Sequence, residues 1–334
     1  MMSDIEARPY DRNYEITDAM FGAFRAPGGA KFFFQLLFWT AIPMTLVLIF
    51  TLPAAVGSYG RLLGSVVSAE ADGTEPPVEE LMSTIGGLYG AIGIIFLAYI
   101  VIASLARAAF FRRYFHGKDD GLFPFRLGRD EWQQFLAQLG YWALYLVAII
   151  VGAIALGIVV GLMAGIGVAT GSEGLGVALT IIGGLIGYVG FFVFLFWFLV
   201  RLLPASALTA LRGKVHVLAA RKVTKNRFWA VFGSALVAGI IAYVVVNVSY
   251  VVAAMIGFSD FMSGGGLEAL SAEEPEAMLS GLGDAMSGSA FRLTSIIAAF
   301  IVSLGLSFYL LLMVGPQAFF TRQWNEADPS AVFE

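Results

Sequence analysis

Long apolar segments alternate with short polar connections along this chain. Six of these segments exceed 20 residues, which is enough for a helix to cross a hydrocarbon layer of about 30 Å. The predicted spans are 32–56, 78–106, 136–169, 176–200, 228–258 and 292–320. Their apolar character is continuous, whereas barrel strands alternate over roughly 10 residues, so the pattern favours helices. The predicted fold class is an all-α integral membrane protein.

The positions of lysine and arginine predict how these spans are oriented. Four regions on one side of the predicted membrane hold 18 of the 20 basic residues: the N-terminal segment, 107–135, 201–227 and the C-terminal tail. The other side holds only Arg61 and Arg292. Because cytoplasmic loops are enriched in basic residues, both termini are expected in the cytoplasm, with the six helices forming three antiparallel hairpins.

Composition supports lipid as the solvent of this protein. Of its residues 59% are hydrophobic and 13% charged, and the mean hydropathy is +0.82, whereas soluble domains are about a quarter charged. The net charge of −4 indicates no nucleic-acid partner, and the absence of cysteine excludes disulfides and thiolate chemistry. The predicted domains are a cytoplasmic segment 1–31 with a candidate interfacial helix, a six-helix membrane domain 32–320 and a cytoplasmic tail 321–334.

The connections opposite the basic side are predicted to be two long loops and one short one. Residues 171–175 are too few for anything but a tight turn, so the third and fourth helices are expected to pair antiparallel. In the loop 57–77, Pro76 and Pro77 precede two acids and predict a helix start. In the loop 259–291, residues 271–286 predict a short surface helix.

Glycines recur every three or four positions in the third and fourth predicted helices. Small residues at this spacing let two helix backbones approach closely, which matters in lipid because apolar burial no longer drives association. The pattern predicts helix packing, either inside the chain or between two copies. The candidate packing residues are Gly157, Gly161, Gly165, Gly183, Gly187 and Gly190.

Within the predicted spans the polar residues are neutral. Charges inside the hydrocarbon usually mark an ion or proton path, and none is found there, which argues against a proton-coupled transporter. Asn247 is a candidate for a solute path or for a bond between helices, and Pro43 for a helix kink with or without a ligand. His116 and His216 have no partner spaced for a metal site or a catalytic triad, so neither a cofactor nor an enzyme is predicted.

The segment 201–227 carries seven basic residues and no acid. Near an anionic leaflet each such residue contributes about 1 kcal/mol of attraction, so contact with anionic lipid is one interpretation and ordinary membrane topology is the other. The candidate lipid contacts are Arg212, Lys214, Arg221, Lys222, Lys225 and Arg227.

The same region carries a resemblance to known proteins. Ala220, Thr224 and Lys225, followed by Phe228 and Trp229, form a basic return to the membrane, and FRLGRDEW at 125–132 looks like a companion motif. The run 201–236 resembles multipass bacterial inner-membrane proteins, including the membrane domain attached to some glycerophosphodiester phosphodiesterases. The resemblance covers about a third of the chain. The phosphodiesterase domain is not part of this sequence, so no catalytic residue is carried over.

These observations together predict a non-enzymatic protein of the inner membrane of a bacterium, with Gram-negative bacteria favoured. The expected role is that of an accessory or structural subunit, or of a scaffold in contact with membrane lipids. A protein partner and a homo-oligomer are both compatible with this role. The alternative is a transporter or channel for a neutral or amphipathic solute through the first, fifth and sixth helices, with Asn247 and Pro43 near its path.

Overall fold

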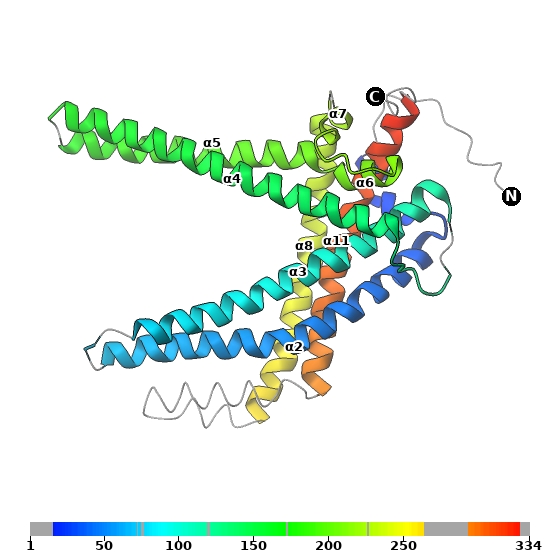
Figure 1. Ribbon diagram of the computed structural model, residues 1–334, viewed down its shortest axis with the longest axis horizontal. Coiled ribbons are helices and arrows are strands. Elements are labelled where there is room, and N and C mark those ends of the chain that lie inside the picture. Colours follow the sequence, from blue (N-terminus) through cyan, green and yellow to red (C-terminus); the bar gives the residue numbers. More distant parts are fainter. Residues whose placement is uncertain are drawn as a thin grey trace. The chain divides into compact units, whose positions relative to one another are not determined.

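A computed structural model describes residues 16–71, 73–74, 77–118, 121–171, 173–225, 227–263 and 293–327. Within these ranges every regular element is a helix, and six helices are long and apolar enough to cross a membrane (Figure 1). They are α2 (Gly29–Ala71), α3 (Val78–His116), α4 (Arg129–Ala169), α5 (Glu173–Leu202), α8 (Phe228–Ser263) and α11 (Leu293–Ala327). The predictions of an all-α fold and of a multi-pass membrane protein are confirmed at this level.

The short helices lie in regions that were expected to be connections. Two of them, α1 (Ile16–Met20) and the 3-10 helix η1 (Phe21–Arg25), fall within the segment predicted to contain an interfacial helix. The other two, α6 (Ala205–Arg212) and α7 (Ala220–Val223), fold the basic segment 201–227. The short helix predicted at 271–286 lies outside the described residues.

Helix α2 is the element whose end differs most from its prediction. It continues to Ala71 instead of ending near residue 56, so most of the predicted loop 57–77 is helical. Each glycine inside a helix costs about 1 kcal/mol relative to alanine. At Ser58, packing against α3 offsets this cost, because Ser58 is buried and a Cβ on Gly87 of α3 would lie 2.9 Å from its Oγ.

Both ends of α3 follow local sequence signals. The helix begins at Val78 directly after Pro77, in agreement with the predicted start. It ends at Gly117, whose φ of 62° is left-handed and whose N–H donates to the carbonyl of Arg113 over 3.0 Å. This is a glycine-terminated helix end, in which only a residue without a Cβ adopts the required backbone freely.

The chain divides into two compact units, each of which takes part of the predicted membrane domain 32–320. Unit 1 comprises Met1–Gly22, Leu127–Ala235 and Pro316–Glu334, and unit 2 comprises Ala23–Arg126 and Leu236–Gly315. Helices α8 and α11 therefore contribute one part to each unit.

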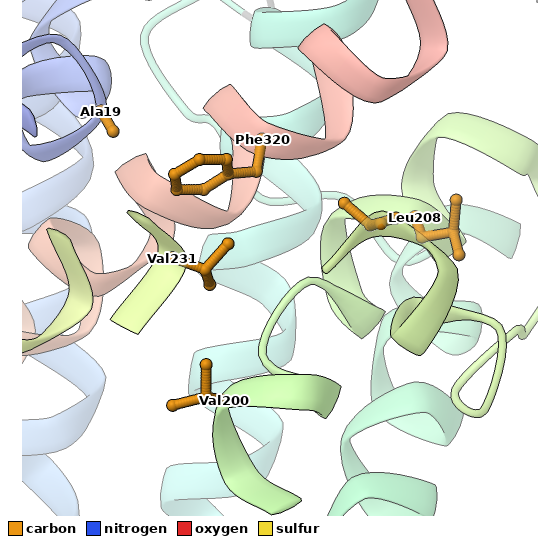
Figure 2. Close-up of a cluster of buried hydrophobic side chains, with 6 residues drawn as sticks. Ala19, Val200, Leu208, Val231 and Phe320 are labelled. Atoms are coloured by element: carbon orange, nitrogen blue, oxygen red, sulfur yellow. The ribbon is translucent and has the colours of Figure 1, made fainter. Parts of the chain in front are cut away.

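In unit 1, α4 and α5 lie side by side, and α6 packs on α4 (Figure 1). The amide of Gln134 on α4 donates to the carbonyl of Ser206 over 3.0 Å, which fixes α6 there. A buried apolar cluster joins the short helices to the ends of the long ones (Figure 2). Its members are Ala19, Val200, Leu208, Val223, Val231 and Phe320. The basic segment is therefore anchored by its apolar residues.

In unit 2, α2 and α3 lie side by side (Figure 1). Aromatic rings join α2 to its neighbours: Phe32 lies 6.4 Å from Phe110 of α3, and Phe33 lies 5.8 Å from Phe308 of α11, centroid to centroid. Helix α11 also approaches α8 closely, since a Cβ on Gly305 would lie 2.8 Å from the Cβ of Ser249. Unit 2 is thus held by aromatic contacts and by small residues at the points of closest approach.

Candidate functional site

The contact between α4 and α5 contains glycines from both helices. Gly167 and Gly176 lie backbone against backbone, so a Cβ added to Gly167 would overlap the main chain of Gly176. Further along α4, a Cβ on Gly152 would lie 2.5 Å from ring atoms of Phe191. These three glycines were not among the predicted packing residues. Each is recognised as a packing residue only by the atoms of the other helix that lie opposite it, which the sequence does not give.

The predicted packing glycines divide into two groups. Gly183 and Gly187 on α5 face α4, because a Cβ on either would lie within 2.6 Å of the side chains of Met163 and Leu156 respectively. The other four have no neighbouring atom within 4 Å of such a Cβ; they are Gly157, Gly161, Gly165 and Gly190. These four meet no neighbour among the described residues, so their role in helix packing stays a prediction.

The reason is the rotation of α4 about its axis. The residues of α4 that face α5 include Leu156 and Met163, whereas Gly157 lies one position further along the helix. One position turns a side chain by about 100° around the axis, which moves the glycine stripe off the contact. The stripe is exposed within the described chain.

The six candidate lipid contacts are also divided by the structure. Four are exposed on unit 1: Lys214, Arg221, Lys222 and Lys225. Arg212 and Arg227 are half-buried and bind α11, since the Arg212 guanidinium lies 5.3 Å from the Trp324 ring and Arg227 Nη1 donates to Gln323 over 3.2 Å. Burial lowers the pKa of Arg227 from its usual value. Thus four of the six are exposed, and two hold the segment to α11.

Arg201, at the end of α5, organises the return of the chain to the membrane. Its guanidinium lies 5.7 Å from the rings of both Trp197 and Phe228, a cation–π arrangement. Its Nη1 also donates over a long 3.4 Å to the hydroxyl of Thr224, which itself donates to the carbonyl of Arg221.

The residues that carry the family resemblance therefore have structural roles. Thr224 and Phe228 hold Arg201, Ala220 is fully buried, and Trp229 is 76% exposed at the start of α8. In the companion motif, the Glu131 carboxylate accepts the N–H of Gly128 over 3.1 Å and closes the first turn of α4. Both motifs fix places where the chain begins a long helix.

The structure places the two histidines in different predicted cytoplasmic connections: His116 ends α3, and His216 lies between α6 and α7. In the part of the chain that the structure describes, no three His, Asp or Glu side chains gather as metal ligands. His216 donates its backbone N–H to Thr209 over 3.4 Å, and His116 is exposed at the end of α3. Partial burial lowers the pKa of His216 from its usual value, and the nearby charges of Arg212 and Lys214 lower it further.

The structure places the two candidate pathway residues on different helices. Asn247 is exposed on α8, and its amide donates to the carbonyl of Tyr243 in the same helix over 2.8 Å. Pro43 is half-buried inside α2, which continues through it without a break. A solute path at these residues stays a prediction.

The comparisons with known proteins add no relative. No family model, no curated protein and no solved structure matches this chain.

A group of residues that the sequence interpretation did not single out lies in unit 2. Lys31 and Arg113 line one cavity there, together with Gly28. The available sequence signals were the Pro-Gly-Gly turn at 27–29 and the paired arginines near the end of α3. Those signals do not show that the two regions meet, because they are far apart along the chain.

Proposed function

We propose that this chain is a multi-pass protein of a bacterial inner membrane that acts without catalysis, as an accessory or structural subunit in contact with lipid. The observation that carries this proposal is the exposed apolar surface of α4 and α5. Only 11% of the residues in the most apolar stretch of each helix are buried within the chain. Side chains such as Ile154, Ile158 and Leu162 are 58%, 57% and 63% exposed. Such a surface needs lipid or another protein against it.

The proposed topology is three antiparallel hairpins with both termini in the cytoplasm. It is supported by the packing of α2 on α3 and of α4 on α5, and by the basic residues on one predicted side. Lys214, Lys222 and their exposed basic neighbours would then face the anionic inner leaflet. The test is a pair of full-length fusions, each with a reporter that is active only in the cytoplasm, at one or the other terminus. Activity from both fusions supports the topology, and a silent reporter at either end refutes it.

The proposed protein contact is the exposed glycine stripe of α4. Gly157, Gly161 and Gly165 repeat every four residues and have open space in front of them. Long apolar side chains flank the stripe, including Ile158 and Leu162. In lipid, a second helix packs closely against such a surface because no Cβ keeps the backbones apart. A second copy of the chain and a different subunit are both accommodated by this geometry.

Affinity purification of the full chain in a mild detergent tests this role. The proposal expects a partner in fixed stoichiometry, either a second copy or another membrane protein. Gly161→Leu should release this partner, whereas Gly190→Leu should retain it, because Gly190 also faces open space but lies on α5 outside the stripe. A chain that purifies alone and moves solute into liposomes would refute the accessory role.

One observation favours the alternative of a solute transporter. In the unit 1 part of α11, the amide oxygen of Gln317 and the hydroxyl oxygen of Thr321 are buried without a hydrogen-bond partner among the described residues. Buried polar atoms ordinarily have such a partner, so these two residues are suited to contact with water or a polar solute.

Liposome swelling with glycerol as the probe solute distinguishes the two functions. If α11 forms a solute path, wild-type protein accelerates swelling and Gln317→Leu abolishes the acceleration. Tyr188→Leu is the control, because Tyr188 is 56% exposed on α5, which is not one of the helices of the proposed path. No acceleration by the wild type supports the accessory role.

A further inference from the structure

A small cavity lies in unit 2 where the start of α2, the end of α3 and the following loop come together. Its volume is about 260 Å³. Gly28 and Lys31 line it from the beginning of α2, Arg113 from α3, and Gly121 and Leu122 from the loop. Pockets for drug-sized ligands are usually about 300–1,000 Å³, so this cavity suits a group smaller than those ligands.

The two charged residues among those that line this cavity are basic. Lys31 and Arg113 are cationic, and the remaining lining residues are neutral. Helix α2 begins at Gly29, so its first turn lies at the same end as the cavity; the N–H groups of Gly29 and Phe32 donate to the carbonyls of Ala26 and Gly28 over 2.7 and 3.4 Å. The N-terminal end of a helix carries a partial positive charge and favours anions. Two full charges and one helix end therefore act on the same small volume.

Arg113 is held in place before any ligand arrives. Its Nε–H donates to the carbonyl of Pro27, and its guanidinium lies 4.6 Å from the centre of the Phe32 ring. Gly28 leaves room for the guanidinium of Arg113, because a Cβ at residue 28 would lie 2.6 Å from Arg113 Nη2. The φ of Gly28, 95°, is also in the left-handed region that favours glycine. Because the guanidinium is fixed from several sides, little of its freedom remains to be lost on binding.

The opposite wall is fixed as well. Gln35 Nε2 donates to the carbonyls of Gly121 and Leu122 over 2.8 and 2.7 Å, which ties the loop to α2. The cavity is thus a built feature of three chain segments, unlike the exposed lysines and arginines of unit 1.

We propose that this cavity binds a phosphate group and that its occupant is the headgroup of an anionic membrane lipid. Arginine and a helix N-terminus both match the oxygens of a phosphate. A lipid is favoured over a soluble phosphate because Leu122, which lines the cavity, is apolar and 81% exposed. On α2, in the turns that follow Lys31, Phe34 and Phe38 are 57% and 50% exposed and offer further surface for acyl chains. The inference rests on the membrane placement proposed above.

The test is native mass spectrometry of the purified full chain with added phosphatidylglycerol or phosphatidylcholine. The wild type should retain phosphatidylglycerol preferentially. Lys31→Gln should lower this retention by about fivefold, the loss expected for one basic residue next to an anionic lipid. Gly28→Ala should lower it similarly without changing any charge, because the added methyl displaces Arg113. Lys118→Gln is the matched control, since Lys118 is an exposed cation just after α3 that does not line the cavity.

Circular dichroism and gel filtration check that each variant folds. If Gly28→Ala does not fold, the Lys31→Gln variant decides the test, because Lys31 is exposed and its replacement should not disturb the fold. Equal retention by Lys31→Gln and Lys118→Gln would show diffuse surface attraction and overturn the proposal. Binding of inorganic phosphate that depends on Lys31, without retention of phosphatidylglycerol, would overturn the assignment to a lipid. A chain shown to be a solute-moving monomer would remove the accessory role and leave this lipid measurement unaffected.

Discussion

The closest approach between α4 and α5 allows a sharp test of the fold through a single methyl group. In Gly167→Ala the new Cβ would overlap the backbone of Gly176, so the two helices must separate locally. In Gly190→Ala, on α5 and outside the glycine stripe, the new Cβ meets nothing within 4 Å. The two variants are chemically identical and differ only in what the methyl group faces.

The expected magnitude follows from two terms. Glycine to alanine inside a helix gains up to about 1 kcal/mol of helix propensity, and this gain is similar for both variants. Forcing an extra methyl into a packed contact costs about 1–3 kcal/mol, and only Gly167→Ala pays this cost. The difference in unfolding free energy between the variants therefore isolates the contact and should be about 1–3 kcal/mol. Gly176→Ala should fall between them, because its Cβ would lie 3.2 Å from the Gly167 Cα.

The assay is equilibrium unfolding of the purified full chain in mixed micelles, with increasing denaturing detergent and helix content or tryptophan fluorescence as the signal. Wild type and the three alanine variants are compared at one protein concentration, since any self-association would shift the midpoint. The expected order of stability is Gly190→Ala, then Gly176→Ala, then Gly167→Ala. Equal stability of the Gly190 and Gly167 variants would refute the placement of Gly167 against α5.

Three further predictions concern single contacts. Arg201→Gln should lower the unfolding free energy by about 1–2 kcal/mol through loss of its two aromatic contacts, whereas the exposed Lys222→Gln should change it by less than about 0.5 kcal/mol in the same unfolding assay. The pKa of His216 is lower in the folded chain than its usual value of about 6.5, so near this pH the unfolded chain binds more protons than the folded chain. The free energy of unfolding should therefore decrease as the pH is lowered through about 6.5. Unfolding of His216→Gln at pH 7.5 and 5.5 should show a smaller fall, and an equal fall would contradict the assignment. Gly305→Ala should lower the free energy of unfolding by about 1–3 kcal/mol, because the new Cβ would lie 2.8 Å from the Cβ of Ser249. Adding Ser249→Gly should recover part of this loss in a double-mutant cycle, and strictly additive effects would show that the two residues do not touch.

Local signals predicted the helices well where the sequence changes character abruptly. The start of α3 after Pro77 and the start of α8 at Phe228 agree with their predicted positions. Helix α2 was predicted too short, because the segment 57–77 was interpreted as a loop. Its continuation to Ala71 includes a contact of Ser58 with α3, and the sequence of α2 alone does not contain that information.

The candidate sites show a similar division. The basic character of 201–227 was visible in the sequence, but the separation of Arg212 and Arg227 from their exposed neighbours depends on contacts with α11. The cavity at Lys31 and Arg113 was not visible, because the two residues meet only when α2 packs on α3.

The sequence by itself determined the number and type of the long elements. A bilayer requires roughly 20 apolar residues per crossing and internally bonded backbone, and both requirements are local properties of a segment. Only the tertiary structure decided which face of each helix meets another helix. A step of one residue turns a side chain by about 100° around the helix axis. Leu156 and Gly157 are neighbours in the same predicted helix, yet Leu156 faces α5 and Gly157 faces open space. The rotation of α4 about its axis is set by the partner it packs against, α5.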